Sequence, residues 1–355
     1  MRLQKLRNIL AEKQLDAILV TDPINRRYLS GFTGSAGALV ITPSQAFLVA
    51  DFRYWSQAAQ QAPDFELIKL GPSASYVKET LYELLGRLGA QRIGFESTNI
   101  TYDQYQEWFA HAEGVEFVPT KGIVEGLRAI KDADEIALIQ RAIAISDAAY
   151  AHVKAFLKPG MTEREVAWEL ESFMRTHGAD ATSFPIIVAS GPNGAMPHAV
   201  TSERVIGEGD PVVIDMGAMV NGYCSDLTRT VYLGEPDQKF RQVYDLVLRA
   251  QLAAEKGIRP GMKGTEADAI ARTIIAEAGY GEQFGHGLGH GVGMSVHEMP
   301  GLGQQSENIL EPGSIITVEP GIYIPEWGGV RIEDMVCVIS DGVEVLTQAD
   351  KDPVI

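Results

Sequence analysis

The chain contains an internal repeat, which constrains its fold more than any other sequence feature. Residues 157–180 (LKPGMTEREVAWELESFMRTHGAD) and residues 258–281 (IRPGMKGTEADAIARTIIAEAGYG) both begin near Pro-Gly-Met and continue as a helical pattern. Each pattern ends near a glycine, Gly178 or Gly279, which is the usual residue just past a helix end. Each copy follows a long helical pattern and precedes a histidine and a strand hairpin with two acidic residues. We therefore expect residues 131–355 to form two related halves, folded face to face around a functional cleft.

Residues 1–130 are predicted to form a separate α/β domain. A chain of 355 residues is too long for one ordinary core, so two domains are expected. Helix and strand signals alternate along the first part, and two apolar runs around a short turn indicate a hairpin and hence a mixed sheet. The polar segment 119–133 places the boundary near Ile130, before a long amphipathic pattern at 133–157. The expected elements are a helix marked by Leu3, Leu6, Ile9 and Leu10, a strand at 17–20, a hairpin of 38–41 and 46–50, a helix near 53–61, a strand at 65–70, a helix near 76–88, a strand at 92–95 and a helix near 102–112.

Two acidic residues, Asp215 and Asp226, lie inside apolar runs of the first predicted hairpin, PVVIDMGAMVNGYCSDLTRTVYL. Aspartate is uncommon in strands. A turn centred on Val220-Asn221 would set the two acids directly opposite each other, whereas a turn centred on Asn221-Gly222 would make them diagonal neighbours. Either register leaves both carboxylates on one face of the ladder. Because burying paired carboxylates is costly without a cation, a metal site is indicated, with exposed strand acids as the alternative.

The second predicted hairpin, IITVEPGIYIPEWGGVRIEDMVCVI, carries Glu319 and Glu333. The midpoint between these residues is Glu326, which lies inside the predicted loop at 325–329. The pairing therefore brings two more acids together on neighbouring strands. Three nearby acids are interpreted as surface or loop residues: Glu311, Glu326 and Asp334.

Three of the seven histidines fall in the glycine-rich segment FGHGLGHGVGMSVHEMPG. The glycines exclude a helix interior and indicate a loop or strand whose backbone lies close to another group. His290 is the expected metal ligand, and His286 and His297 are expected hydrogen-bond donors or proton carriers. His198, in the loop-like GPNGAMPHAV, corresponds loosely to His297 in the repeat. The remaining histidines are expected in surface or packing roles on helices: His111, His152 and His177.

Four carboxylates and one imidazole form a hard, oxygen-rich donor set. This set suits Mn²⁺ or Co²⁺, and Fe²⁺ and Zn²⁺ are also compatible with it. Five ligands exceed the needs of one tetrahedral ion, and shared carboxylates commonly bridge two ions about 3.5–4 Å apart. We therefore expect two divalent metal ions, most favourably manganese, with a bridging water as the nucleophile. Cys224 is expected to pack near the site rather than to bind the metal.

The motifs IDMGAMVNGYCSDLTRT, GHGLGHGVGMSVHE and VEPGIYIPEWGGVRIED resemble the metallopeptidase family of methionine aminopeptidase, aminopeptidase P and prolidase, whose catalytic domain has the pita-bread fold. The resemblance covers most of the chain. The family's ligands fall in order on Asp215, Asp226, His290, Glu319 and Glu333. By resemblance, Asp226 and Glu333 bridge the two metals. Asp215 would then chelate one metal, while His290 and Glu319 would bind the other.

The same resemblance assigns further residues to the site. His198 and His297 match the histidines that stabilise the tetrahedral intermediate and pass a proton to the leaving imide nitrogen. His286 and Arg331 match accessory positions in the proline-specific members, where the arginine supports the metal-binding carboxylates. The expected catalytic residues are therefore His198, His286, His297, Glu319 and Arg331.

The domain at 1–130 is similar to the creatinase-type N-terminal domain of the proline-specific branch. The stretches YLSGFTGSAGALVI and ADFRYWSQA are especially similar to aminopeptidase P, whereas methionine aminopeptidases generally lack this domain. The implied fold class is an α/β N-terminal domain followed by an α+β pita-bread domain with pseudo-twofold symmetry. The resemblance also implies a homodimer in which the N-terminal domain limits substrate length. An Xaa-Pro bond has a tertiary amide, so its recognition needs a shaped pocket.

The favoured function is removal of the first residue from short peptides with proline in the second position, as an Xaa-Pro aminopeptidase. The alternative is a prolidase restricted to Xaa-Pro dipeptides, which shares the same catalytic residues. A dipeptidase needs a cation for the substrate's C-terminal carboxylate, and Arg26, Arg27 and Arg53 are candidates, although surface or interface arginines are the simpler interpretation. A non-catalytic binding module of this fold is a remote alternative, because all five ligands are present.

Charge and composition exclude several other classes. The net charge of -17 argues against nucleic-acid binding, which needs a basic face. No apolar run approaches the roughly 20 residues that span a bilayer. The chain has only two cysteines, Cys224 and Cys337, and charges interrupt the apolar positions of its N-terminus, so we expect a cytoplasmic protein without a signal peptide.

Overall fold

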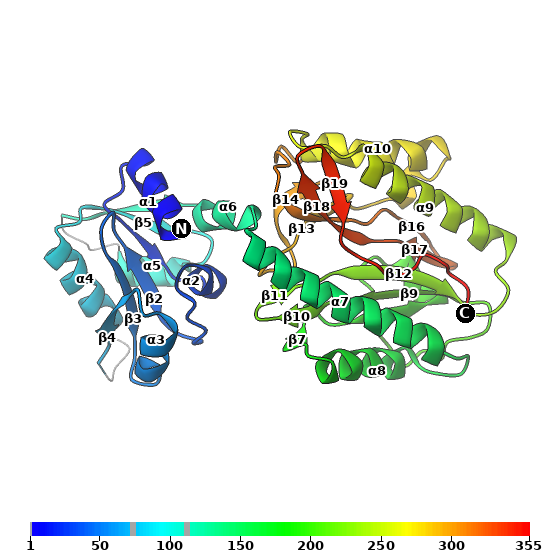
Figure 1. Cartoon of the computed structure of the whole chain (residues 1–355), viewed down its shortest axis with the longest axis horizontal. Helices are drawn as coiled ribbons and strands as arrows, with labels where there is room; N and C mark the ends of the chain where they lie inside the picture. The colour runs from blue at the N-terminus through cyan, green and yellow to red at the C-terminus, as the bar shows by residue number, and fades with distance from the viewer. Residues whose placement is uncertain (1, 72–75, 110–113) are drawn as a thin grey trace. The chain divides into compact units, whose positions relative to one another are not determined.

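The computed structural model describes residues 2–71, 76–109 and 114–355 (Figure 1). The chain divides into two compact units, Met1–Arg128 and Ala129–Ile355. In the described part of the chain, none of the helices combines the length and the apolar character needed to cross a membrane.

A six-stranded sheet forms the centre of the first unit, in the order β4-β3-β2-β1-β5-β6. Because β1 pairs antiparallel with β2 and parallel with β5, the expected mixed sheet is confirmed. Leu19, Val40, Phe47 and Ile93 are among the buried residues of its core. The elements are α1 (Arg2–Glu12), β1 (Ala17–Val20), α2 (Pro23–Ser30), β2 (Ala38–Ile41), β3 (Ala46–Ala50), α3 (Trp55–Gln61), β4 (Glu66–Lys69), α4 (Tyr76–Leu88), β5 (Arg92–Glu96), α5 (Tyr102–Trp108), β6 (Glu116–Thr120) and α6 (Ile123–Ala129).

Three short elements have no counterpart among the predicted ones: α2, β6 and α6. α2 carries a clear start signal, because the Asp22 carboxylate accepts from the first backbone N–H groups and Pro23 occupies the first turn. α6 occupies part of the segment that was predicted only as a polar boundary. α5 ends at Trp108 with Phe109 as its C-cap, and residues 110–112 of the helix expected there, including His111, lie outside the described residues.

Arg26 is buried, so neither its candidate role in capturing a substrate carboxylate nor its interpretation as a surface arginine is correct. Its guanidinium donates to the carbonyl oxygens of Gly34 (2.5 Å) and Gly37 (2.6 Å) and thereby ties down the loop between α2 and β2. Arg53 is exposed and forms an ion pair with Asp51 at 2.8 Å. For Arg53 and for Arg27 the role stays a prediction.

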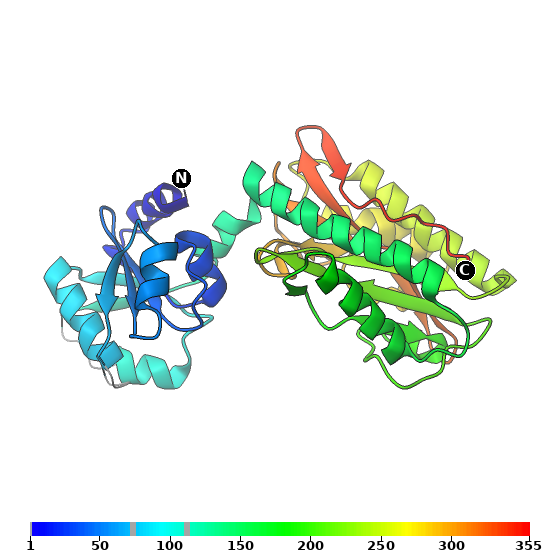
Figure 2. The ribbon, with the colours of Figure 1, turned by 60° about the horizontal axis from the view of Figure 1, so that its bottom comes forward.

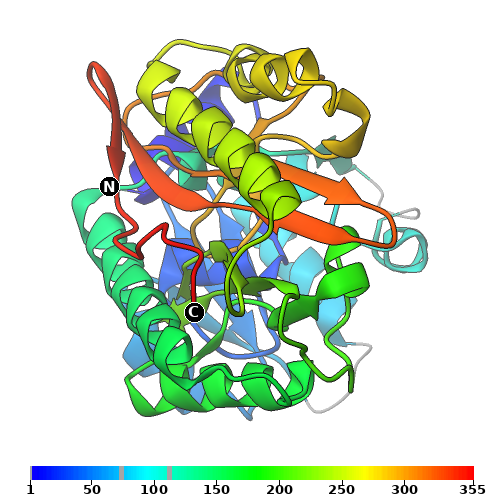
Figure 3. The same ribbon diagram turned by 90° about the vertical axis from the view of Figure 1, so that its right-hand side faces the viewer.

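The second unit consists of two halves, each with a helix pair packed on its own strands (Figures 1 and 3). α7 and α8 lie side by side in the first half, as Figure 2 also shows, and α9 and α10 pack together in the second. Each half has a separate hydrophobic core. The elements are α7 (Ala133–Phe156), α8 (Glu163–Thr176), β7 (Ala181–Thr182), β8 (Ile187–Ser190), η1 (Gly191–Ala195), β9 (Pro211–Met216), β10 (Ala218–Val220), β11 (Tyr223–Cys224), β12 (Leu227–Tyr232), α9 (Gln238–Gly257), α10 (Gly264–Glu277), η2 (Gly281–Gln283), β13 (Gly289–Gly291), β14 (Glu298–Leu302), β15 (Ile315–Val318), β16 (Gly321–Ile324), β17 (Gly328–Arg331), β18 (Asp334–Ile339) and β19 (Gly342–Val345).

The sequence repeat is also a structural repeat. α8 and α10 each have 14 residues and occupy matching places in the two halves. The glycines after them, Gly178 and Gly279, have φ angles of 105° and 87°, which confirms the left-handed position expected at each helix end. Just before each helix, one residue forms an isolated antiparallel bridge, Thr162 in the first half and Lys263 in the second.

Turn chemistry sets the register of the first hairpin. Asn221 and Gly222 have φ angles of 53° and 82°, and two adjacent positive angles are what a type I′ hairpin turn requires. In the resulting register Asp215 pairs with Thr228. Asp215 and Asp226 are therefore diagonal neighbours, as expected for the turn centred on Asn221-Gly222.

The second hairpin has the predicted register. Val318 pairs with Asp334 and Gly321 pairs with Arg331, which places Glu319 across from Glu333. Glu326 stands at the tip with a φ angle of 64°. The connecting loop is shorter than predicted, because strand β17 already begins at Gly328.

Candidate active site

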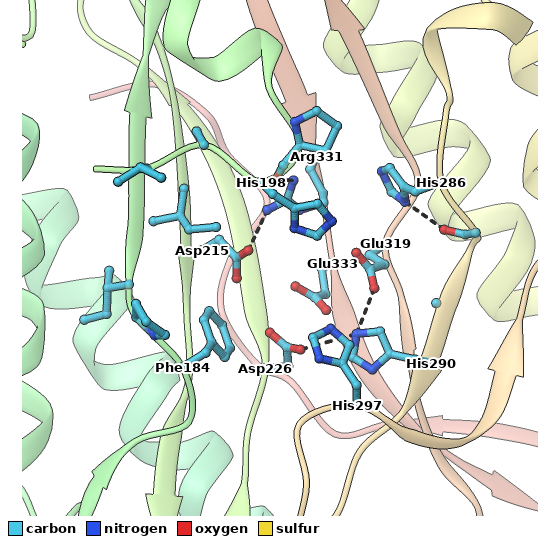
Figure 4. A pocket seen from close by; sticks show the side chains of 18 of the residues that line it. Phe184, His198, Asp215, Asp226, His286, His290, His297, Glu319, Arg331 and Glu333 are labelled. Atoms are coloured by element: carbon cyan, nitrogen blue, oxygen red, sulfur yellow. Dashed lines mark hydrogen bonds and ion pairs between the residues drawn. The ribbon is translucent and has the colours of Figure 1, made fainter. Parts of the chain in front are cut away.

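One pocket in the second unit, with a volume of about 660 Å³, brings together every predicted site residue (Figure 4). Its polar lining comes from both halves: Asp215, Asp226, Glu319, Glu333, His198, His286, His290, His297 and Arg331. Its apolar lining comes from the first half: Phe184, Pro185, Ile186, Ile187, Pro197, Ala199 and Val200. The pocket thus presents a charged wall and an apolar wall to one bound molecule.

The acids reach the pocket from strand ends. Asp215 lies near the end of β9 and Asp226 directly precedes β12, while Glu319 directly follows β15 and Glu333 directly precedes β18. One ligand atom each of Asp226, His290 and Glu333 lies within 4.8 Å of the other two. His290 Nε2 is 3.2 Å from Glu319 Oε1 and 3.6 Å from Asp226 Oδ2. The predicted ligand residues therefore converge, although their roles as ligands stay predictions.

Burial and mutual repulsion dominate the electrostatics of the acids. Burial and then the neighbouring carboxylates raise the pKa of Asp226 well above its usual value. The same two causes, in the same order, raise the pKa of Glu333. Burial also raises the pKa of Asp215, and the charge of Arg331 opposes this rise. The pocket therefore resists holding all of these carboxylates in the charged form unless further positive charge is supplied.

Glu319 and His290 form a pair of opposite charge. Burial favours the neutral form of each group, but the contact between them outweighs it. The hydrogen bond and charge of His290 lower the pKa of Glu319 to about 2. In return, Glu319 raises the pKa of His290 to about 9. One imidazolium thus balances one of the four carboxylates.

The donor set fits divalent cations. Asp215 Oδ1 is buried and has no hydrogen-bond partner among the described residues. Leaving such an oxygen unpaired is costly, and crowding four buried carboxylates together adds to the cost. Divalent cations would compensate both, because carboxylate oxygens and an imidazole nitrogen are ligands that they accept. The residues present are therefore suited to the predicted metal ions.

Hydrogen bonds orient the predicted ligands. His290 Nδ1 lies 3.1 Å from the Gly291 carbonyl oxygen, so a proton on Nδ1 leaves Nε2 free to face the carboxylates. Thr317 donates to Glu319 Oε1 at 2.9 Å, and Thr228 donates to Glu333 Oε2 at 2.8 Å. Such contacts commonly fix the direction of metal-binding side chains.

Arg331 supports the acids from the side. Its guanidinium donates to Asp215 Oδ2 at 2.6 Å, to Thr228 Oγ1 at 3.0 Å and to the Tyr323 hydroxyl at 2.8 Å. A further bond of 3.2 Å reaches the Pro197 carbonyl oxygen. Arg331 therefore lies where the sequence predicts it, and Tyr323 and Thr228 are site residues that the sequence pattern did not reveal.

The three pocket histidines outside the ligand set have different surroundings. His286 Nε2 lies 2.8 Å from the Tyr323 hydroxyl, and burial lowers the pKa of this histidine. The ring of His297 lies 4.2 Å from that of His290, centre to centre. Desolvation in the pocket, followed by the nearby His290, lowers the pKa of His297. His198 is exposed at the pocket rim. The lowered pKa values of His286 and His297 favour neutral imidazoles, which can accept a proton.

A second charged cluster lies directly behind Glu333. Asp334 is buried and forms ion pairs with Arg229 (2.7 Å) and Lys351 (2.6 Å), so its prediction as a surface or loop acid is wrong. Arg229 also donates to the Glu333 carbonyl oxygen at 2.5 Å. Glu255 lies 3.5 Å from Lys351 Nζ. This cluster fixes the backbone that carries Glu333.

Of the remaining predictions, Cys224 is buried on β11, two residues before Asp226, and its packing near the site stays a prediction. Glu311 and Glu326 are exposed, as expected. His152 and His177 pack against Phe173 on the surface of the α7–α8 pair, with ring centres 4.6 and 3.8 Å away, which agrees with a packing role.

Known proteins resemble the chain over nearly its whole length. Residues 137–340 match metallopeptidase family M24, and residues 2–130 match the creatinase/prolidase N-terminal domain. The solved structure of an Xaa-Pro dipeptidase from Bacillus anthracis has a TM-score of 0.96 and 46% identity, covering 100% of this chain and 99% of its own. An Xaa-Pro dipeptidase from Pyrococcus furiosus is 37% identical over 99% of both chains. The structure of an X-Pro aminopeptidase from Thermotoga maritima has a TM-score of 0.89 and 36% identity, covering 96% of this chain and 98% of its own.

Proposed function

The chain belongs to metallopeptidase family M24, and we propose that it is an Xaa-Pro dipeptidase, which cleaves dipeptides that end in proline. Its fold is the expected one, a creatinase-like domain followed by a pita-bread domain. The observation that carries the proposal is the end-to-end similarity to proteins named Xaa-Pro dipeptidase, at up to 46% identity. These relatives favour the dipeptidase over the aminopeptidase that the sequence alone favoured.

The Xaa-Pro aminopeptidase remains the second candidate. The relative from Thermotoga maritima bears that name and is 36% identical. Both activities would use the pocket described above, so its acids and histidines do not distinguish them. The difference is expected at the far end of the substrate, where a dipeptide carries a carboxylate and a longer peptide continues.

Two divalent ions, which we propose to be Mn²⁺, would be held by Asp215, Asp226, His290, Glu319 and Glu333 and would supply Lewis acidity and an activated water. In the proposed reaction, water adds to the carbonyl carbon, the C–N bond breaks, and a proton passes to the imide nitrogen of proline. His297 and His198 flank the acids and are suited to stabilise the developing charge and to deliver this proton. The apolar wall is suited to the proline ring, which offers no N–H.

We also propose that the domain at 1–130 limits substrate length and contributes to contacts in a homodimer. The resemblance of this domain to the creatinase/prolidase N-terminal domain supports the proposal. Gel filtration with light scattering would test the dimer, and a monomer at micromolar concentration would contradict it.

The substrate proposal is tested by comparing an Ala-Pro dipeptide with an Ala-Pro-Ala tripeptide at equal metal occupancy. We expect kcat/KM for the dipeptide to exceed that for the tripeptide at least tenfold, as an order-of-magnitude estimate from loss of a recognised carboxylate. Ala-Ala serves as the proline-free control, and chelated protein as the metal-free control. Equal or faster cleavage of the tripeptide would favour the aminopeptidase, and no cleavage of either peptide would refute both candidates.

A further inference from the structure

Glu163, the first residue of α8, is fully buried outside the pocket lining. Among the described residues, its carboxylate has no ion-pair partner. A buried carboxylate is costly unless hydrogen bonds compensate for the lost water. The bonds that compensate at Glu163 all come from one segment of the chain.

The two oxygens of Glu163 hold the two ends of that segment. Oε1 accepts from the backbone N–H and the hydroxyl of Ser190, at 2.7 and 2.8 Å. Oε2 accepts from the backbone N–H and the hydroxyl of Ser202, at 3.0 and 2.6 Å. The Asn193 side-chain amide lies 3.1 Å from both oxygens. One carboxylate therefore closes the loop 190–202 at its base, through hydrogen bonds that are stronger than neutral ones.

The loop 190–202 carries His198 and part of the apolar wall, including Pro197 and Val200. His198 is exposed, so the path of the backbone, rather than packing around the ring, determines where it lies. The loop has further attachments. The Thr201 hydroxyl accepts from Val188 N–H and donates to the Ile186 carbonyl oxygen, both at 2.9 Å, η1 packs against β17, and Arg331 donates to the Pro197 carbonyl oxygen at 3.2 Å. Glu163 is the residue that joins the two ends of the loop, and Arg331 holds it next to His198.

In the second half, the segment that corresponds to the loop 190–202 is held without a carboxylate from the helix. Gly264 begins α10 in the place that Glu163 takes in α8, and a Cβ there would lie 2.2 Å from the Gly301 carbonyl oxygen. The adjoining segment is instead closed by Gly301 N–H donating to Asn308 at 2.9 Å. The fold therefore does not require an acid at this position, and Glu163 is a feature of the half that carries His198.

We propose that Glu163 is a positioning residue for catalysis, which holds the loop 190–202 so that His198 faces the acidic residues of the pocket. The proposal rests on the proposed function, because the role of His198 in peptide hydrolysis is part of it. Glu163 itself is not among the residues that line the pocket. Misplacement of a reacting group by about 1 Å can cost on the order of 100-fold in rate.

The test is a double-mutant cycle with Glu163→Gln and His198→Ala, measured on an Xaa-Pro dipeptide. Gln keeps the shape but replaces one accepting oxygen by a donor that faces other donors. Each single variant should lose about 10- to 100-fold in kcat. The double variant should lose no more than His198→Ala alone, since Glu163 acts through His198. Metal content should stay at the wild-type level in all variants.

The controls separate positioning from general stability. Glu165→Gln changes an exposed acid in the first turn of the same helix and should leave kcat unchanged. Hydrogen exchange of Glu163→Gln should increase in residues 190–202 and stay unchanged in α9. If Glu163→Gln does not fold, Ser202→Ala removes the 2.6 Å bond and should show a smaller loss with the same dependence on His198.

Any of three results would overturn the proposal. The losses in kcat of the two single variants could multiply in the double variant, Glu163→Gln could keep full activity, or hydrogen exchange in residues 190–202 could stay unchanged. Failure of the proposed function would look different, because the wild-type protein itself would then cleave no Xaa-Pro peptide. The exchange measurement does not depend on activity and would still report whether Glu163 holds the loop.

Discussion

Glu255 gives a quantitative test of the charged cluster behind Glu333. Burial, followed by the hydrogen bond and charge of Asp334, raises the pKa of Glu255 from 4.5 to about 7. Because the folded-state pKa is raised, the protonated form favours folding. This contribution is fully present below the unfolded pKa and is lost as the pH rises through the folded value. At about 1.4 kcal/mol per pKa unit, the shift corresponds to an upper limit of about 3 kcal/mol.

The lowered pKa of Asp334 acts in the opposite direction, because burial there is outweighed by the charge of Arg229, the hydrogen bond with Glu255 and the charge of Lys351. We therefore expect a net effect of about 1–2 kcal/mol for Glu255. Glu255→Gln imitates the protonated carboxyl and removes the titration. The variant should match the wild type near pH 4.5 and exceed its stability by about this amount at pH 8, which is a rise of a few degrees in melting temperature.

Calorimetry at pH values from 4.5 to 8 measures this difference. A chelator should be present throughout, so that pH-dependent metal binding does not contribute. Glu277→Gln, at an exposed position in α10, is the matched control and should give a curve parallel to that of the wild type. A parallel curve for Glu255→Gln would refute the reasoning, because Glu255 would then have an ordinary pKa in the folded protein.

Three further predictions concern the hairpins and the metal ions. Asp226→Asn removes one of four crowded carboxylates, so the chelated variant should melt a few degrees above the chelated wild type. With saturating Mn²⁺ the order should reverse, and the variant should be less stable than the wild type. Calorimetry measures both states, and a variant that is less stable in both would contradict the prediction. Arg331→Lys loses the planar guanidinium that holds Asp215, and a metal titration should show an affinity about 10-fold or more weaker. Unchanged metal affinity would count against a supporting role for Arg331. Asn221→Ala should lower the free energy of unfolding in urea by about 1 kcal/mol, and Asn221→Gly should lower it hardly at all, because glycine adopts a positive φ freely. Equal losses of stability in the two variants would argue against the type I′ turn.

Those parts of the fold that depend on local chemistry could be predicted from the sequence. Asn221 and Gly222 specify a hairpin turn, and the turn alone decides which residues pair with Asp215. Glu319 and Glu333 are equally far from Glu326, and this spacing predicts the register of the second hairpin. A period of two along each strand then puts the acids of one hairpin on one face, whatever the rest of the chain does.

The remaining site residues depend on contacts between distant parts of the chain. Tyr323 belongs to the site because its hydroxyl meets both Arg331 and His286, and nothing in the apolar strand around it indicates this. Asp334 was misassigned because its partners, Arg229 and Lys351, are far away in sequence. Arg26 was misassigned for a related reason, since local sequence does not reveal which carbonyl oxygens a buried guanidinium will meet.

The pairing of Glu319 with Glu333 limits how the chain length can vary between them. A residue inserted in only one of the two strands would turn the side chains beyond it to the opposite face, unless a bulge absorbed it. Insertions at the tip, between β16 and β17, would leave the pairing untouched. Natural variants should therefore differ in length at this tip, or by matched changes in both strands, while the two glutamates keep facing each other. The number of residues that separates them along the chain is free to change, whereas their equal distance from the tip is not.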